Sequence, residues 1–165
     1  MAIKEALLAE LKHESSSTRR ILERVPGDKF AWKPHEKSYT LGRLATHIAQ
    51  IPGWIMRIIN HEQFDFAVNQ YKPITAESNE QLMKIFEDTL AENIATLETA
   101  SDDLLNNSWT FRRGEQIFFA LPRKVALRNM AFNHLVHHRG QLSVYLRLLN
   151  IPVPGMYGPS ADETL

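Results

Sequence analysis

The sequence predicts an all-α, up-down four-helix bundle, and three observations support that class. Four stretches, each about 20 to 27 residues long, repeat apolar residues at the spacing of an α-helix. Turn-forming segments separate them, with crossover connections expected over residues 26–39 and 61–77. The 165 residues also fit one domain, residues 1–165, which is large enough to bury a core without disulfide bonds.

The first two helices are expected over residues 3–25 and 40–60. A Pro-Gly pair ends the first, and Thr40 is a suitable N-terminal cap for the second. Pro52 lies inside the second helix, where its ring and missing N–H should kink the helix just after His47.

The third helix is expected from about Ser78 through Leu97, and the fourth over about residues 123–149. Between them, residues 107–121 read NSWTFRRGEQIFFAL, with aromatic and β-branched residues around an Arg-Gly pair. This composition predicts a short hairpin. The tail from Ile151 is rich in proline and glycine and is expected to be a coil.

Composition excludes several classes of function. Lysine plus arginine total 19, as do aspartate plus glutamate, so no single-sign field favours nucleic acid or a membrane surface as a partner. Cysteine is absent, which excludes disulfides, thiolate metal ligands and a protein thiol nucleophile. No stretch approaches the roughly 18 apolar residues of a membrane span. We therefore expect a cytoplasmic protein.

Residues 133–141, NHLVHHRGQ, contain three histidines. On a helical wheel with His134 at 0°, His138 falls at about 40° and His137 at about −60°, while the apolar face is centred near 40°. His134 and His138 should point inward, one turn apart, where they can share a metal ion. On the second helix, His47 belongs to the apolar stripe and could supply a third ligand.

A lone inward histidine is more often a hydrogen-bonded core residue than a ligand. Three inward histidines, two of them at metal spacing, favour a metal site instead. Three neutral imidazoles would leave coordination positions open for water or substrate, as catalysis requires. Leu135 stands where a zinc protease of the H-E-x-x-H type has its glutamate, which disfavours proteolysis.

Two segments of the sequence resemble a known family. WKPHEKSYTLGRLATHIAQIPGW (32–54) and HHRGQLSVYLRLLNIPVPGMYGPSADE (137–163) closely resemble the DinB-like family of metal-dependent four-helix bundles. The resemblance covers the second helix, the fourth helix and the tail. It implies a bundle of DinB-like type that binds one divalent metal ion, commonly zinc or nickel, through His47, His134 and His138.

The resemblance also bears on the reaction. Similar proteins include transferases and isomerases that use bacillithiol, mycothiol or glutathione, and the family name describes induction by DNA damage rather than DNA chemistry. Because the chain has no cysteine, a sulfur nucleophile must arrive as a small cosubstrate. We expect transfer of a low-molecular-weight thiol to a small electrophile, with no cofactor besides the metal. The alternatives are a metal-dependent hydrolase and a noncatalytic metal-binding stress-response module.

A deep apolar pocket at the metal would favour an enzyme, and a metal flush with the surface would favour the module. Three residues are candidates for catalysis: His137 as a base, Arg139 as a clamp for an anionic substrate, and Tyr157 at the mouth of the bundle. Each residue also has a structural alternative: His137 could simply be solvated, Arg139 could be paired with a carboxylate, and Tyr157 could belong to a packed coil. Trp54 could line the pocket or pack in the core.

A homodimer is also expected. Phe132 and Val136 fall at about 160° and 200° on the wheel, with Ser143 between them, opposite the core stripe. Similar proteins often form homodimers, and outward apolar residues are typical of a subunit interface. The alternative is that these residues pack under a connection such as residues 107–121.

Overall fold

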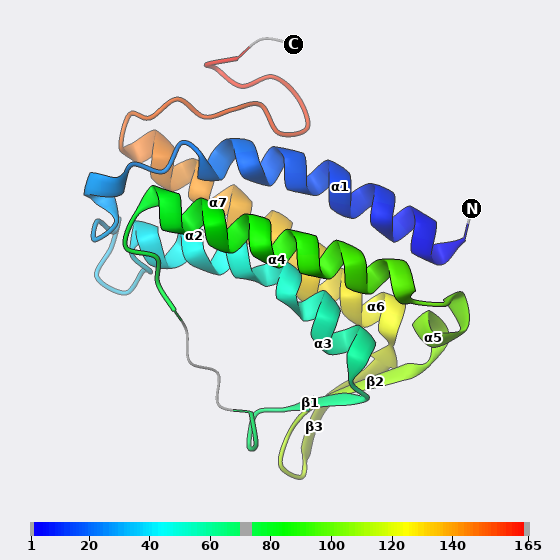
Figure 1. Cartoon of the computed structure of the whole chain (residues 1–165). Helices are drawn as coiled ribbons and strands as arrows, with labels where there is room; N and C mark the ends of the chain where they lie inside the picture. The colour runs from blue at the N-terminus through cyan, green and yellow to red at the C-terminus, as the bar shows by residue number, and fades with distance from the viewer. Residues whose placement is uncertain (1, 70–73, 164–165) are drawn as a thin grey trace.

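The long helices lie side by side and form the body of the molecule, with a small sheet at one end (Figure 1). The computed structural model describes residues 2–69 and 74–163; residues 70–73 of the expected 61–77 connection and the end of the tail lie outside this range. The regular elements are α1 (Ile3–Leu22), α2 (Leu41–Gln50), α3 (Trp54–Asn60), β1 (Gln63–Asp65), α4 (Asn79–Thr99), α5 (Asp102–Asn106), β2 (Ser108–Arg113), β3 (Gln116–Pro122), α6 (Arg123–Leu127) and α7 (His134–Leu148).

The predicted all-α class is wrong, because β1, β2 and β3 form a three-stranded mixed sheet in that order. β2 and β3 are the hairpin expected over residues 107–121, paired antiparallel with Ser108 opposite Pro122. β1 lies parallel to β2 on its other edge, with Gln63 opposite Thr110. β1 has only three residues, too few to show strand periodicity, and its partner strand is far away in the chain.

The expected 40–60 helix is divided into α2 and α3 by a 3₁₀ turn at Ile51–Gly53. This turn contains Pro52, so the predicted interruption after His47 is present and has the cause that the sequence indicates. Thr40 caps α2 as expected, since its side chain accepts a hydrogen bond from the Arg43 amide.

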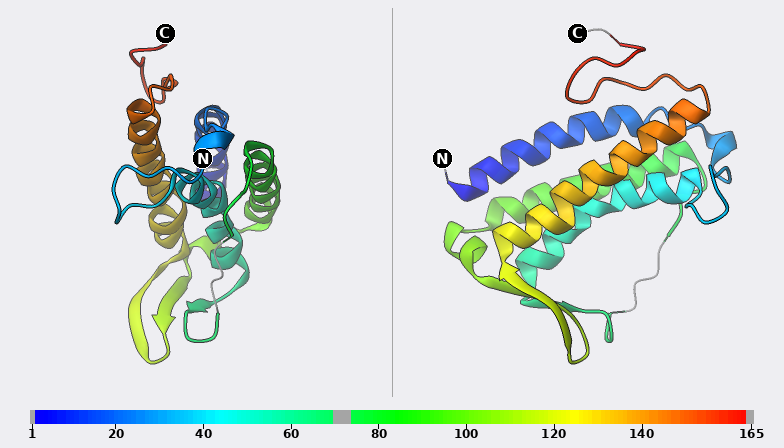
Figure 2. Two further views of the ribbon diagram at one scale, coloured as in Figure 1. Left: turned by 90° about the vertical axis from the view of Figure 1, so that its left-hand side faces the viewer. Right: turned by 180° about the vertical axis from the view of Figure 1, so that it is seen from behind.

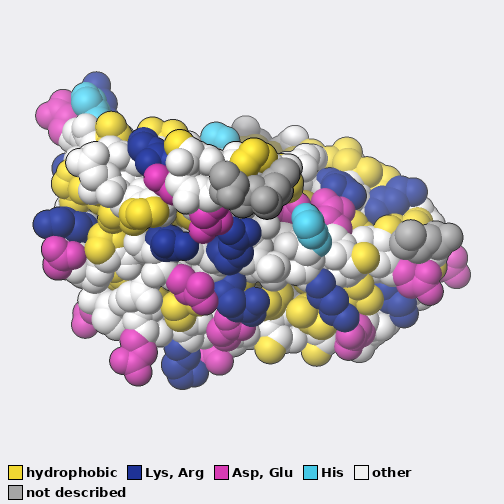
Figure 3. All heavy atoms as spheres, turned by 90° about the horizontal axis from the view of Figure 1, so that it is seen from above, with side chains coloured by type: hydrophobic (Ala, Val, Ile, Leu, Met, Phe, Trp, Pro, Cys, Tyr) yellow, Lys and Arg dark blue, Asp and Glu magenta, His cyan; other side chains and the backbone are white. Residues whose placement is uncertain are grey.

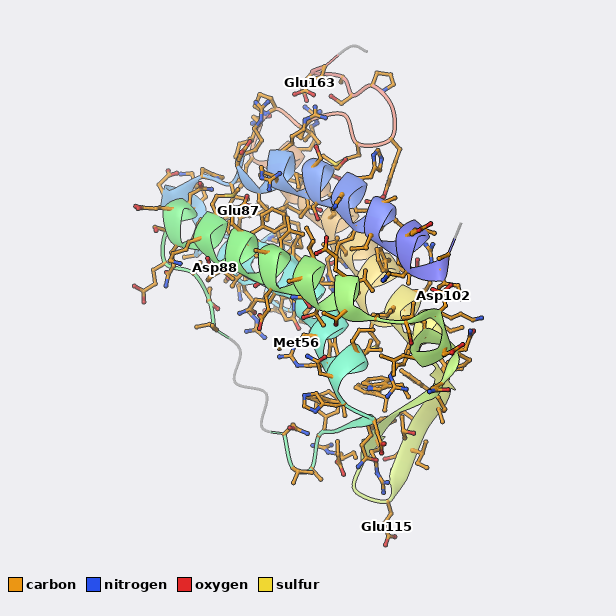
Figure 4. The ribbon with its side chains drawn as sticks, turned by 45° about the vertical axis from the view of Figure 1, so that its right-hand side comes forward. Met56, Glu87, Asp88, Asp102, Glu115 and Glu163 are labelled. Atoms are coloured by element: carbon orange, nitrogen blue, oxygen red, sulfur yellow. The ribbon has the colours of Figure 1, made fainter. Side chains whose placement is uncertain are left out.

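Asn93, a fully buried residue of α4, holds this interruption in place. Its Oδ1 accepts a hydrogen bond from the Met56 amide at 2.8 Å, and its Nδ2 donates to the Thr89 carbonyl at 2.6 Å. Met56 lies in the first turn of α3 (Figure 4), where the backbone amides have no partner within the helix. The buried amide of Asn93 therefore satisfies a donor that the helix break leaves free.

The fourth expected helix is also interrupted, by a π-helical turn at Arg128–Asn133 between α6 and α7. Seen from behind, α7 crosses the molecule beside α1 and α2 (Figure 2). Its buried residues are Leu135, Arg139, Leu142 and Leu146. These residues, and not the histidines, mark the centre of the face that α7 turns into the core.

The C-terminal segment after α7 runs back over α1 (Figure 1). Ion pairs hold this segment in place: Glu163, labelled in Figure 4, binds Arg20 of α1 and Arg24 just after α1, and Asp162 binds Arg147 of α7. On the face seen in Figure 3, side chains of both charge signs are interspersed. Among the described helices, none is long and apolar enough to cross a bilayer.

Candidate metal centre

His47, His134 and His138 meet where α2 packs against the start of α7. The Nε2 atoms of His47 and His134 are 3.3 Å apart, and those of His138 and His134 are 2.9 Å apart. One nitrogen from each ring lies within 4.8 Å of the other two, and all three side chains are half-buried. The three histidines selected from the sequence are thus brought together.

The π-helical turn before α7 orients His134. At the end of this π-helical turn the backbone does not return at once to the i−4 hydrogen bonds of an α-helix. The His134 amide donates to the Ala131 carbonyl instead of to Met130. The Met130 carbonyl lies 3.2 Å from Nδ1 of His134, so it accepts the Nδ1–H and leaves Nε2 free to face the other rings.

Gln141 orients His138 in the same way. Its Oε1 lies 2.8 Å from Nδ1 of His138, and its Nε2 lies 3.1 Å from Nε2 of His137. A Gln141 amide that accepts from His138 and donates to His137 satisfies both contacts. Nε2 of His138 therefore faces the cluster as an acceptor. His137 is exposed and lies outside the cluster, next to His138.

The three imidazoles are neutral near pH 7. Burial, together with neighbouring His138 and His134, lowers the pKa of His47 from 6.5 to about 4. Burial is also the main cause that lowers the pKa of His134 and of His138. A neutral imidazole is the form that binds a metal ion.

The arrangement fits a divalent cation. A tetrahedral zinc ion with bonds of about 2.0–2.1 Å holds its ligand nitrogens about 3.3 Å apart. The His47–His134 separation equals this value, and the His138–His134 separation is shorter by a few tenths of an ångström. With Nδ1 of two rings engaged by oxygen acceptors, their Nε2 lone pairs point at one another, an arrangement that a cation between them would stabilise. The group could therefore bind a metal ion.

A cleft of about 860 Å³ opens beside the cluster. His47 and His134 lie in its lining. Its wall is aromatic: Trp54 packs edge-on against Phe64 and Phe111, with ring centroids 5.1 Å and 5.8 Å apart. Trp54 thus lines the pocket beside the cluster. The aromatic residues of 107–121 predicted a hairpin from the sequence. The position of Phe64 beside Phe111 could not be predicted in this way, because it depends on the pairing of β1 with β2.

Arg139 and Tyr157 lie elsewhere, in a buried cluster between α1, α7 and the tail. Arg139 is 2% exposed and binds Glu14 of α1 at 2.5 Å. The Tyr157 hydroxyl donates to the same carboxylate at 2.8 Å, although the Tyr157 ring is largely exposed. Neither residue lines the cleft. Their contacts are structural, which favours the paired arginine and the packed coil over catalytic roles.

The helical wheel placed the centre of the α7 core face too close to the histidines. Arg139, at about 140° on that wheel, is buried, while His134 and His138 lie at the edge of the buried stripe. The wheel counted only apolar residues, so it could not include a buried arginine whose carboxylate partner is on another helix. This position favours ligand binding, because His134 faces the cleft instead of the packed interior.

A mainly helical fold with a three-histidine cluster that could bind a metal ion fits a metal-binding protein. The model of the DinB family matches residues 1–164, and the chain belongs to that family. The resemblance seen in the sequence is thereby confirmed.

Curated relatives are similar over most of the chain. The chain is 23% identical over 160 residues to YrdA of Bacillus subtilis (strain 168), covering 94% of this chain and 89% of YrdA. It is 27% identical over 134 residues to YjoA of the same strain, covering 79% of this chain and 80% of YjoA.

Solved structures share the fold. A DinB-like protein from Bacillus cereus ATCC 10987 has a TM-score of 0.74 at 22% identity, with 93% of this chain and 97% of that chain covered. YjoA of Bacillus subtilis has a TM-score of 0.68 at 20% identity, with coverages of 89% and 96%. At such identities these structures bear on the fold and not on the reaction.

Proposed function

We propose that the protein is a divalent-metal-dependent enzyme that transfers a low-molecular-weight thiol to a small electrophile. The observation that carries this proposal is the cleft of about 860 Å³ with His47 and His134 in its lining. A concave site with apolar walls and a few convergent polar groups is typical of small-molecule binding. A module that only presents its metal to a protein partner would need no such cleft.

His47, His134 and His138 would hold one zinc or nickel ion, because imidazole nitrogens suit these borderline metals. Such an ion supplies Lewis acidity that favours loss of the thiol proton at neutral pH. The thiol proton would pass to solvent, the sulfur would form a bond to the electrophilic carbon, and the leaving group would depart with its electron pair. The chain has no cysteine, so the sulfur must come from a cosubstrate.

A conjugation assay tests the proposal directly. Zinc- or nickel-loaded protein is incubated with the electrophile monobromobimane and one thiol at a time. The thiols are bacillithiol, mycothiol, glutathione and coenzyme A. With at least one thiol, we expect a conjugation rate above that of the uncatalysed reaction. Chelation of the metal and the His47→Ala substitution should both reduce the rate to that background, because each removes the bound ion.

The assay has a matched control and two contrary outcomes. His13→Ala removes an exposed imidazole of α1 that lies outside the cluster and should leave the rate unchanged. Absence of conjugation with all four thiols, combined with metal-dependent cleavage of an ester or amide, would replace the proposal with a hydrolase. Inactivity in both assays would support the noncatalytic module.

We also propose a homodimer, with a change to the face expected from the sequence. Phe132 is only 2% exposed and lies under the Arg128 guanidinium, which binds Glu10 of α1, so it is packed within the chain. Val136 remains on the surface of α7, together with Val144. The corrected interface therefore consists of the outer, solvent-facing side of α7.

Light scattering checks the dimer. The wild-type protein is expected to have twice the chain mass of 19.0 kDa. Val144→Arg, which places a charge on the outer face of α7, should convert it to the monomer. A wild-type mass of one chain at working concentration would rule the dimer out, and an unchanged Val144→Arg dimer would rule out this face.

A further inference from the structure

Arg57 of α3 places a guanidinium in the lining of the cleft that contains His47 and His134. It lies over the Trp54 ring, 5.4 Å from the ring centroid, and its Nη1 donates to the Gly53 carbonyl at 2.8 Å. The side chain is half-buried. Two contacts thus fix the group in position and leave further N–H donors of its planar fork for another acceptor.

The backbone of the helix break provides the space for this guanidinium. A Cβ atom added at Gly53 would come within 3.0 Å of Nη1 of Arg57. The lack of a side chain at Gly53 therefore lets Arg57 fold back against the turn and over Trp54. Because this turn directly follows α2, the same interruption sets the position of Arg57 relative to His47.

The charges around Arg57 indicate the valence of its ligand. Within the described residues, no carboxylate lies within 4.0 Å of the Arg57 guanidinium, whereas several other arginines of the chain are ion-paired. The other charged side chain of the cleft lining is Glu92 of α4. With the proposed metal ion (+2) and its thiolate (−1) bound beside Arg57 (+1) and Glu92 (−1), one net positive charge remains in the cleft, which favours a singly charged anion over a dianion.

We infer that Arg57 is the anion-binding residue of the cleft and that the substrate held there is an aromatic or otherwise apolar monocarboxylate. The guanidinium fork matches a carboxylate in two parallel hydrogen bonds. The Trp54, Phe64 and Phe111 rings would cover the apolar body of the same molecule. This inference rests on the proposed function, since it identifies the class of the electrophilic substrate.

Calorimetric titration with a simple probe tests the inference without turnover. The probe is 3-phenylpropionate, titrated into wild-type, Arg57→Gln and Arg43→Gln proteins, each in zinc-loaded and metal-free form. We expect wild-type protein to bind it, and Arg57→Gln to weaken binding about tenfold or more, as for the loss of hydrogen bonds to a charged group. Arg43 also lies over an aromatic ring, Tyr39, but outside the cleft lining, so Arg43→Gln should bind normally.

Two further ligands show how binding depends on the charge of the ligand. The neutral amide 3-phenylpropionamide should bind wild-type protein weakly and should be insensitive to Arg57→Gln. In the metal-free protein, phenyl phosphate, which is a dianion near neutral pH, should bind less tightly than the carboxylate, because Glu92 repels its second charge. A tighter phosphate would overturn the monocarboxylate assignment.

Carboxylate binding that depends only on zinc and is unaffected by Arg57→Gln would show that the ion, and not Arg57, holds the anion. Failure of every probe to bind would overturn the inference as well. Neither result bears on thiol conjugation, which the bimane assay measures separately. The thermal unfolding midpoint of each variant should match that of the wild-type protein. Weaker binding then cannot be attributed to loss of the fold.

Discussion

Replacing both His134 and His138 with alanine is expected to abolish binding of a divalent metal ion by this protein. Each imidazole supplies one of the three nitrogens that converge, and only His47 would remain. Metal sites with four ligands bind zinc with about 10–16 kcal/mol, or roughly 3 kcal/mol per ligand. Loss of two ligands should therefore weaken binding by roughly four orders of magnitude.

Elemental analysis after dialysis against zinc or nickel checks this result, with one ion per chain expected for the wild-type protein. The His137→Ala variant is the matched control, because His137 is on the same helix but outside the cluster. It should retain the full metal content. Full occupancy in the double variant would show that the ion binds elsewhere, and a folded metal-free wild-type protein under the same conditions would show that the cluster has no affinity.

The pairing of His134 with His138 could be predicted because it depends on local geometry. Histidines four residues apart on a helix share a face whatever the rest of the fold, so His134 and His138 are paired by spacing alone. Pro52 marks the break after His47, since a missing N–H and a ring clash act within a single turn. The structure contains both features.

The sheet and the cleft wall could not be predicted in the same way. The parallel pairing of Gln63 with Thr110 joins segments that are distant in sequence, and a strand of three residues has no detectable period. Only this pairing brings Phe64 next to Phe111 and closes the wall beside Trp54. The long-range pairing of this short strand is therefore the reason that the third strand of the sheet and the Phe64–Phe111 wall of the cleft were not predicted.

Orientation of the ligands depended on interactions that hydropathy does not encode. The π-turn makes the Met130 carbonyl available to His134, and the Gln141 amide bonds to His138. Gln141 could have been recognised, since it lies three residues after His138 and thus on a neighbouring position of the helix surface. The π-turn has no equivalent signal in the composition of residues 128–133.

The second prediction with a large expected effect concerns Arg139, whose replacement by alanine should strongly destabilise the fold. The Arg139 and Glu14 side chains are only 2% and 9% exposed. Arg139 also donates to the Glu14 carbonyl at 3.0 Å and to Thr18 Oγ1 at 3.1 Å. Removal of the arginine leaves a buried carboxylate without its cation, which typically costs about 3–5 kcal/mol. This is a large part of the roughly 5–15 kcal/mol that stabilises an ordinary domain.

The Tyr157 hydroxyl would be the main remaining partner of Glu14. Although the ring is largely exposed, desolvation of the hydroxyl beside Glu14 and its hydrogen bond to that carboxylate raise the pKa of Tyr157, so the hydroxyl stays protonated and can donate. One neutral donor is a weaker partner for a carboxylate than a guanidinium. Chemical denaturation should therefore show a much lower free energy of unfolding for Arg139→Ala. Arg147→Ala is the matched control, since Arg147 is on the same helix and also binds a carboxylate, but its side chain is 49% exposed.

A double variant distinguishes two causes of the instability expected for Arg139→Ala, namely the unpaired buried charge of Glu14 and the loss of packed volume. Arg139→Met combined with Glu14→Leu removes both charges and keeps most of the buried volume, so it should recover most of the stability lost in Arg139→Ala. Thiol conjugation by this double variant should then be close to that of the wild-type protein, because neither residue lines the cleft. An Arg139→Ala protein with wild-type stability and no activity would instead restore Arg139 as a catalytic residue.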